Sequence, residues 1–304
     1  MLHQIDFETV RQFPDMAFMA RQVVEGFITG LHKSPFHGFS VEFSEHKPYN
    51  VGQSVRNIDW RLFARSDKLF IKKFEEETNL RCQIVIDGSS SMYFPSMDYN
   101  KMVFSVYGAA VLMELLKQQR DAFGLSIFSE QTNLHTPCRS SLTHQKLLLN
   151  YLENTLNQPK THNKTSTVSA LHQIAELVHK RSLIVIFSDI LDAGGINADL
   201  FAALQHLKYK KNEVVLFYTI DKRLEMDFEY GNQPHEFTDM ETNEKVLISN
   251  PKQIQAQYTK TTSEFRTQIA AQCIQYGIEF VEVDIAKGFY DVLLTYMVKR
   301  NKMV

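Results

Sequence analysis

Cys82-Gln83-Ile84-Val85-Ile86, followed at once by Asp87-Gly88-Ser89-Ser90-Ser91-Met92, is the stretch that decides the fold. A short apolar run with β-branched residues predicts a buried strand. The polar side chains that follow lie where this strand ends, and in open α/β sheets ligands bind at the carboxyl ends of the strands. Oxygen-bearing side chains spaced two residues apart in a tight loop suit Mg²⁺, Mn²⁺ or Ca²⁺ more than zinc. The stretch therefore predicts a candidate metal-binding loop at the end of a sheet strand.

Two later segments carry the same kinds of side chain. Lys164-Thr165-Ser166-Thr167 precedes an amphipathic helix predicted over residues 168–180. A second buried strand is predicted over residues 183–187, and it ends in Ser188-Asp189. The sequence thus offers three polar segments in order, and two of them follow predicted strands.

An Asp-x-Ser-x-Ser loop, a Thr before a helix and an Asp at a later strand end, in this order, resemble a known arrangement. It is the metal-ion-dependent adhesion site of von Willebrand factor type A domains. The resemblance implies a divalent cation, Mg²⁺ or else Mn²⁺ or Ca²⁺, as the cofactor. By the same resemblance, the ligands of the ion are Asp87, Ser89, Ser91, Thr165 and Asp189.

Two of these five positions have a competitor nearby. Thr167 competes with Thr165, but Thr165 fits the spacing of the family better, and Thr167 is expected to cap the following helix. Asp192 competes with Asp189, but Asp189 lies at the strand end itself. Serines after a strand can also cap a helix, although the Thr and Asp segments favour metal ligation. We expect the ligands to converge in a shallow cup open to water.

Three segments nearer the N-terminus resemble the signature of one bacterial family. They are Gly38-Phe39-Ser40-Val41-Glu42-Phe43, Tyr49-Asn50-Val51-Gly52 and Val55-Arg56-Asn57-Ile58-Asp59-Trp60-Arg61-Leu62-Phe63-Ala64-Arg65. The family is domain-of-unknown-function family 58, which carries a von Willebrand type A-like domain and commonly goes with MoxR-type AAA+ ATPases. This sequence departs from the pattern at His46-Lys47-Pro48 and at Gly52-Gln53, which leaves the role of that loop open.

Size and composition limit the classes of protein that fit. A chain of 304 residues with 44% hydrophobic content can bury one large core or two modest ones. A net charge of -2 and a pI near 6.6 argue against binding nucleic acid through bulk charge. No apolar run reaches the length of a membrane span, and the first residues do not resemble a signal peptide. Three widely spaced cysteines form neither a disulfide nor a zinc pattern, so we expect a reducing, cytoplasmic location.

Strands and helices alternate along the chain after residue 81. Such alternation predicts an α/β fold, with a mostly parallel sheet covered by helices on both faces. The resemblance described above implies that this fold is of the von Willebrand factor type A-like (Rossmann-like) class. Strands are expected at 122–128, 213–219 and 277–284, with a possible edge strand at 132–136, and helices at 99–119, 143–156 and 289–298.

The chain is expected to divide into two domains. Residues 1–80 are assigned to an N-terminal helix, over 7–31, and a small β-rich element. Residues 81–304 are assigned to the von Willebrand type A-like domain, with a hairpin insert around 227–250 where the periodicity lapses.

Two functions from different classes are compatible with these features. The first is a non-enzymatic, metal-dependent protein-binding module, in which an acidic side chain of a partner replaces a water on the ion. The family resemblance implies a MoxR-type AAA+ ATPase as the partner, in complex assembly or a chaperone-like role. The alternative is a Mg²⁺-dependent phosphoryl-transfer or hydrolytic enzyme with Asp87 as nucleophile. Haloacid-dehalogenase-type phosphatases, however, place a second acid two residues later, where this chain has Ser89. The sequence leaves the oligomeric state open.

Overall fold

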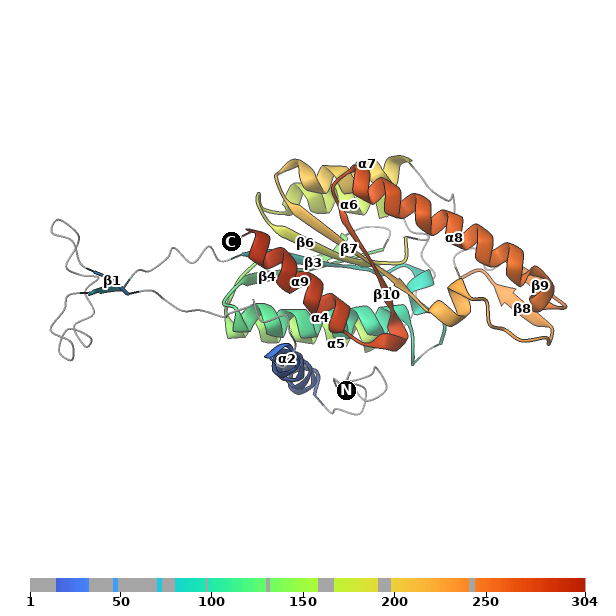
Figure 1. Ribbon diagram of the computed structural model, residues 1–304, viewed down its shortest axis with the longest axis horizontal. Helices are drawn as coiled ribbons and strands as arrows, with labels where there is room; N and C mark the ends of the chain where they lie inside the picture. The colour runs from blue at the N-terminus through green and yellow to red at the C-terminus, as the bar shows by residue number, and fades with distance from the viewer. Residues whose placement is uncertain are drawn as a thin grey trace. The chain divides into compact units, whose positions relative to one another are not determined.

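A six-stranded sheet forms the centre of the main body of the chain (Figure 1). The computed structural model describes residues 15–32, 46–48, 70–72, 80–96, 98–129, 132–157, 167–190, 198–240 and 244–303. In spatial order, the strands are β10 (Glu279–Asp284), β7 (Glu213–Ile220), β6 (Leu183–Ser188), β3 (Arg81–Asp87), β4 (Ala122–Phe128) and β5 (Thr132–His135).

All strand pairs in this sheet are parallel except the last, because β5 runs antiparallel to β4 at one edge. The inner strands are apolar on both faces, and every residue of β6 is buried, as expected for a parallel sheet covered on both sides. Side chains alternate between the faces, so that Ile184 and Ile186 join one core, whereas Phe187 stacks on Phe217. The predicted α/β class and mostly parallel sheet are confirmed.

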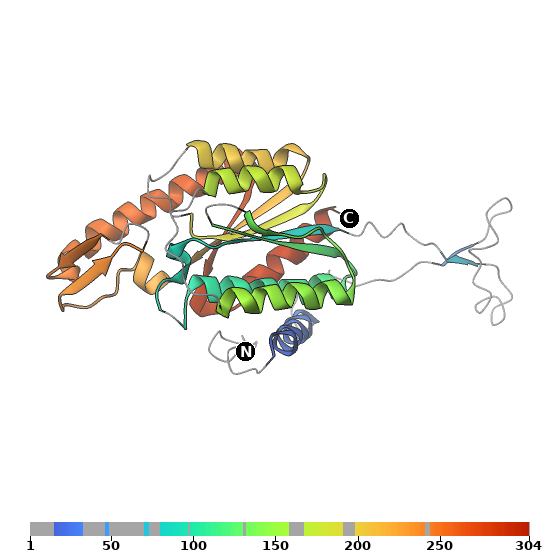
Figure 2. The same cartoon turned by 180° about the vertical axis from the view of Figure 1, so that it is seen from behind.

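Helices cover both faces of the sheet, as the front and back views show (Figures 1 and 2). One face carries α4 (Lys101–Gln118), α5 (Leu142–Asn157) and α9 (Tyr290–Met303). The other face carries α6 (Thr167–Leu177), α7 (Ala198–Tyr209) and α8 (Pro251–Gln275). The core on the second face joins apolar residues of all three of its helices to the sheet, among them Leu171, Leu204 and Ile269.

The order of the strands places a topological switch point between β3 and β6. From β3 the chain continues to β4 and β5 on one side, then returns to β6 on the other side. At such a point the two connecting segments leave in opposite directions, and a crevice opens outside the carboxyl ends of the strands. The two polar segments that contain Asp87 and Asp189 follow these two strands, so the fold places both segments at the crevice.

The sequence predicted a hairpin that the structure contains, but it did not predict two of the helices. The predicted insert contains an antiparallel hairpin of β8 (His235–Thr238) and β9 (Lys245–Ile248), as expected. The periodicity did not reveal α7 or α8. Most of α8 is polar and exposed, with Ile269 and Cys273 buried only near its end, so its sequence carries little of the apolar stripe that identifies a helix.

The chain divides into two compact units, residues 28–79 and the remainder. The smaller unit contains the antiparallel pair β1 (His46–Pro48) and β2 (Phe70–Lys72). Helix α2 (Met16–His32) begins in the main unit, where Phe27 contacts Tyr290 edge to face. The predicted domain boundaries stay a prediction, and the family signature at residues 38–65 lies almost entirely outside the described residues.

No described helix is both long enough and apolar enough to cross a membrane.

Candidate functional site

The loop after β3 leaves the sheet through a glycine. The Gly88 N–H donates to the Phe128 carbonyl oxygen on the neighbouring strand β4, at 2.6 Å. A Cβ at this position would lie 2.8 Å from that same oxygen, closer than real Cβ atoms approach. Glycine therefore lets the loop turn tightly against β4, which keeps the following serines at the carboxyl ends of the strands.

Hydrogen bonds join the side chains of the two polar segments that follow β3 and β6. The Ser89 and Ser91 Oγ atoms lie 3.0 Å apart, and Ser91 Oγ donates to Asp189 Oδ1 at 3.1 Å. Both oxygens of Asp87 also accept hydrogen bonds: Ser188 Oγ donates to Oδ2 at 2.6 Å, and the Ser89 N–H donates to Oδ1 at 2.9 Å. Four of the five predicted ligands thus meet at the switch point.

A buried ammonium group stands beside these oxygens. Lys101, the first residue of α4, contacts Asp189 Oδ2 at 2.7 Å and Glu225 Oε1 at 2.6 Å through its Nζ. Glu225 belongs to a single π-helical turn, Lys222–Met226, that follows β7. Its second oxygen accepts from the Asp221 N–H at 2.7 Å, so that the carboxylate is held from both sides.

Burial and charge shift the pKa values of three of these groups. Burial, followed by the nearby charge of Asp189, raises the pKa of Asp87 to about 7, although the hydrogen bonds from Ser188 and Ser89 oppose this shift. Burial also raises the pKa of Glu225, against the lowering effect of Lys101. For Lys101, burial lowers the pKa, but the carboxylates of Asp189 and Glu225 more than offset this and hold it above its usual value. The ammonium is therefore charged, and Asp87 is poised between its two forms near neutral pH.

The described candidate ligands are more enclosed than the open cup that we expected. Asp87 and Ser89 are each 2% exposed, and Asp189 is 1% exposed. Ser91 is only partly buried. Among the described candidate ligands, Ser91 is thus the one through which the site reaches solvent.

The Thr segment is described only in part. Thr165 and Asp192 lie outside the described residues. Thr167 is the first residue of α6 and is buried, which agrees with the predicted start of this helix. The choice between Thr165 and Thr167 as a ligand stays a prediction.

Sequence reasoning missed Ser188, Lys101 and Glu225. Ser188 had a local signal, because it stands beside Asp189 at a strand end. Lys101 also had one, because a basic residue in the first turn of a helix opposes the helix dipole and breaks a local rule without an evident gain. For Glu225 no local pattern exists, since its contact with Lys101 spans 124 residues of sequence.

The oxygen spacing suits a small divalent cation. Two neighbouring ligands of an octahedral Mg²⁺ ion, each about 2.1 Å from it, lie about 3.0 Å apart. The Ser89–Ser91 and Ser91–Asp189 contacts, at 3.0 and 3.1 Å, have this separation. The donor set therefore fits the ion that the sequence predicts.

Among the described residues, no three or more His, Cys, Asp or Glu side chains form a group that could hold a metal ion. The predicted set is of a different kind, since three of its five members are hydroxyl groups.

A second, largely buried polar network lies on β3, β4 and the segment that begins at the end of β5, so it shares only β3 with the candidate site. Its members are neutral, and we call it the neutral network: Gln83, Ser126, His135, Thr136 and Cys138. Gln83 Nε2 donates to Ser126 Oγ at 2.9 Å, and Ser126 Oγ lies 2.9 Å from His135 Nδ1. Cys138 Sγ donates to Gln83 Oε1 at 3.3 Å. Gln83, Ser126, His135 and Cys138 thus pair with one another, and Thr136 Oγ1 pairs with the Leu125 backbone.

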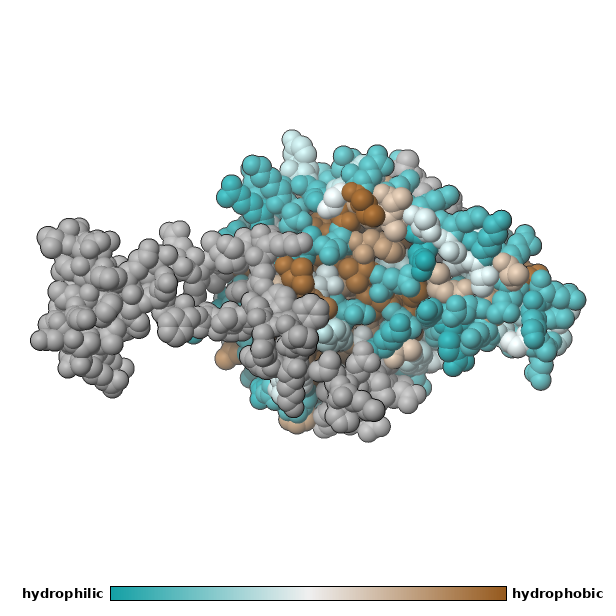
Figure 3. Space-filling model, in the orientation of Figure 1, coloured by the Kyte–Doolittle hydropathy of each residue, from teal (hydrophilic) through white to brown (hydrophobic). Residues whose placement is uncertain are grey.

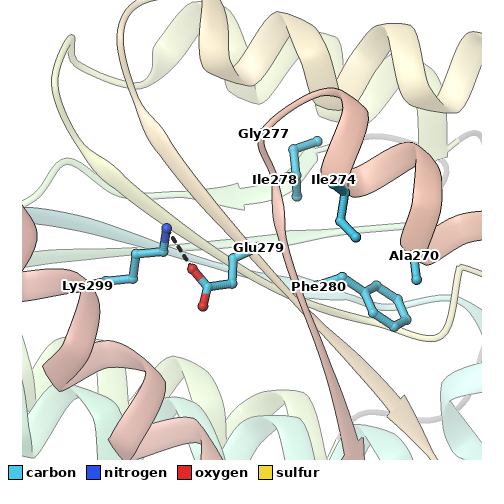
Figure 4. A pocket seen from close by; sticks show the side chains of 7 residues that line it. All are labelled: Ala270, Ile274, Gly277, Ile278, Glu279, Phe280 and Lys299. Atoms are coloured by element: carbon cyan, nitrogen blue, oxygen red, sulfur yellow. Dashed lines mark ion pairs between the residues drawn. The ribbon is translucent and has the colours of Figure 1, made fainter.

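A surface hollow of about 320 Å³ lies at the amino end of the edge strand β10 (Figure 4). Apolar side chains gather over β10 in the space-filling view (Figure 3), and Ile274 at the end of α8 is 76% exposed. The charged residues that line the hollow are Glu279 and Lys299, and they pair with each other at 2.6 Å. Because this pair leaves no net charge and faces apolar neighbours, the hollow lacks a set of groups for metal or acid–base chemistry.

A family model described as "Protein of unknown function DUF58" matches residues 45–268. The chain belongs to this family, DUF58. Among curated relatives, the uncharacterized proteins Mb1516 of Mycobacterium bovis and Rv1480 of Mycobacterium tuberculosis are each 25% identical to it over 177 residues. The match covers 58% of this chain and 55% of each relative, so this DUF58 chain spans about half the length of the curated relatives it matches.

Solved structures similar to this DUF58 chain include von Willebrand type A domains. The conserved hypothetical protein BatB of Bacteroides thetaiotaomicron has a TM-score of 0.46 and 13% identity, over 74% of this chain and 98% of that one. The SpRpn10 VWA domain has a TM-score of 0.36 and 12% identity, over 71% of this chain and 94% of that one.

Proposed function

We propose that this DUF58 chain is a non-enzymatic, metal-dependent protein-binding module. In this proposal a divalent cation, Mg²⁺ or else Mn²⁺ or Ca²⁺, binds at the carboxyl ends of β3 and β6. Its ligands are Asp87, Ser89, Ser91, Thr165 and Asp189. The observation that carries the proposal is that four of these side chains, from the loops after β3 and β6, converge at the switch point of the sheet.

The charges of the site favour a cation. Two carboxylates, those of Asp189 and Glu225, contact one ammonium, that of Lys101, and the carboxyl of Asp87 lies near enough to Asp189 for that charge to raise its pKa. Ionised carboxylates without enough counter-charge are costly in a buried setting, as the raised pKa of Asp87 reflects. A divalent ion would balance this excess.

The bound ion would serve recognition. Mg²⁺ keeps several waters in most protein sites, so an Asp or Glu of a partner can replace one of them and become a ligand. Such a bridge selects partners by an acidic side chain that reaches the half-buried Ser91 side of the site. The family resemblance suggests a MoxR-type AAA+ ATPase as the functional associate, in complex assembly or a chaperone-like role in the cytoplasm.

Phosphoryl transfer through Asp87 is the alternative, and the geometry gives it little support. A nucleophilic carboxylate needs a free oxygen in line with the substrate phosphorus. Asp87 is 2% exposed, and both of its oxygens already accept hydrogen bonds, from Ser188 and from the Ser89 N–H. We therefore assign no catalytic residue.

Calorimetric titration with Mg²⁺ and Mn²⁺ tests the metal function. Wild-type protein is expected to bind one ion, and Asp87→Ala to lose this binding. The matched control is Asp284→Asn, which alters an acid at the carboxyl end of a different strand, β10, and is expected to bind as wild type does. Absence of binding to the wild type would overturn the proposal.

Two further assays separate recognition from catalysis. Co-purification of the chain with a MoxR-type ATPase is expected to weaken when a chelator is added, and a complex that is indifferent to chelator would contradict docking through the metal. Metal-dependent hydrolysis of a generic phosphate ester that Asp87→Ala abolishes and Ser91→Ala retains would favour the enzyme instead.

A further inference from the structure

Lys101 is a fully buried cation at the first position of α4. Its side chain is 0% exposed, and its neighbours in the first turns of α4 include the fully buried Phe104 and the nearly buried Met102. An ammonium at the start of a helix opposes the helix dipole, and burial adds a large desolvation cost. Such a group is retained only where partners compensate it. Its two partners are the carboxylates of Asp189 and Glu225, so its place is set by the candidate metal site.

We infer that Lys101 is the fixed counter-cation of this site and limits how tightly the site binds a divalent ion. This inference rests on the metal function proposed above. Asp189 connects the two, because its Oδ1 accepts from the candidate ligand Ser91 and its Oδ2 from Lys101. The ammonium neutralises Asp189 when no ion is present and repels an ion that binds beside it. The chain thereby keeps its ligands in place without metal, at the expense of metal affinity.

Glu225 acts in the opposite direction. It shares the ammonium with Asp189, since Lys101 Nζ lies 2.6 Å from Glu225 Oε1. Removing its charge leaves the ammonium fully to Asp189 and also takes one negative charge away from the neighbourhood of the ion. Both effects weaken binding of a cation. Neutralising Lys101 and neutralising Glu225 should therefore change metal affinity with opposite signs, which a merely structural role of the ion pair does not predict.

The test is calorimetric titration of the full chain with Mn²⁺ for the wild type, Lys101→Met and Glu225→Gln. Methionine keeps much of the length of the lysine stem and removes the charge. We expect Lys101→Met to bind Mn²⁺ about tenfold tighter or more, and Glu225→Gln to bind it several-fold more weakly. Lys117→Met is the matched control on the same helix, because Lys117 pairs with Glu114 at 3.0 Å and contacts none of the candidate ligands, so its affinity should equal that of the wild type.

Thermal unfolding gives a second measurement of metal binding and shows whether each variant folds. Thermal unfolding in chelator and in excess Mn²⁺ should show a larger metal-induced rise of the midpoint for Lys101→Met than for the wild type. Lys101→Gln replaces it if the methionine variant does not fold. Equal or weaker Mn²⁺ binding by the folded Lys101 variant, beside normal binding by the wild type, overturns the inference and leaves the proposed function standing. Absence of binding by the wild type and the variant overturns both. Binding by the variant alone supports the role of Lys101 and overturns metal binding by the wild type.

Discussion

The neutral network and the charged network both include a residue of β3, but they differ in whether their charges balance. We call the second the charged network: Asp87, Ser89, Ser91, Lys101, Ser188, Asp189 and Glu225. In the neutral network, side chains such as Gln83, Ser126 and His135 form hydrogen bonds with one another. In the charged network, the single ammonium of Lys101 contacts two carboxylates, those of Asp189 and Glu225, and Asp87 adds a third carboxyl beside Asp189. A polar network whose groups are all paired stabilises a fold. Under the function proposed above, the surplus charge of the charged network would instead be balanced by a bound cation.

The largest effect is expected from Lys101→Met in the absence of metal. The substitution leaves Asp189 and Glu225 buried without their counter-charge, so the free energy of unfolding should fall by about 3–5 kcal/mol. Urea unfolding in chelator measures it. Lys117→Met, which breaks a more exposed pair, should cost at most about 1 kcal/mol. A loss below about 1 kcal/mol for Lys101→Met would mean that the charged network does not depend on this ammonium.

Gly124→Ala should disturb the neutral network instead. A Cβ there would lie 2.6 Å from Gln83 Oε1 and 2.7 Å from the Thr136 carbonyl oxygen. Displacing these atoms should lower the free energy of unfolding by about 1–3 kcal/mol. Because this network has no surplus charge, Mn²⁺ should not restore the loss in urea unfolding. A metal-dependent recovery that exceeds that of the wild type would break the distinction between the two networks.

Acid should weaken the neutral network through His135. Burial lowers the pKa of His135 in the fold, whereas the unfolded chain takes up the proton near the ordinary histidine value of about 6.5. Between these two pKa values the unfolded state binds more protons, so the contribution of His135 is complete above about pH 6.5 and falls as the pH drops towards the folded pKa.

Urea unfolding of the wild type and of His135→Gln at pH 7.5, 6.5 and 5.5 measures this contribution. The stability difference between the two proteins should shrink or reverse as the pH falls, because glutamine does not titrate. A difference that is constant with pH would contradict the assignment. Remaining acid sensitivity of the variant is expected, since burial also lowers the pKa of His144.

The smallest effect is expected from Cys138→Ser. Burial raises the pKa of the Cys138 thiol to about 12, so the group is a neutral donor, to Gln83 Oε1, at physiological pH. A serine hydroxyl can donate to the same oxygen, and the free energy of unfolding should change by less than about 1 kcal/mol. In the wild type, a thiol reagent should label Cys138 far more slowly than it labels the unfolded chain. Rapid labelling of the native protein would show that this thiol is not enclosed in the network.

Local sequence patterns predicted the strands well. The strand predicted at 122–128 has the same bounds as β4, and the predicted edge strand is β5, because short apolar or alternating runs report burial directly. The patterns failed for α8 and for α7. Helix α8 buries few side chains along its length, so its position depends on contacts made near its ends with the rest of the fold. The family signature also identified DUF58 from sequence, and the family match agrees.

The sequence by itself determined the α/β class and the order of the polar segments that end in Asp87 and Asp189, because strand formation and the chemistry of adjacent residues are local properties. Only the tertiary structure decided that Lys101 would meet Asp189 across 88 residues and Glu225 across 124 residues. Those contacts depend on the order in which strands enter the sheet and on where α4 starts against it. The balance of charge at the candidate site is a product of that order.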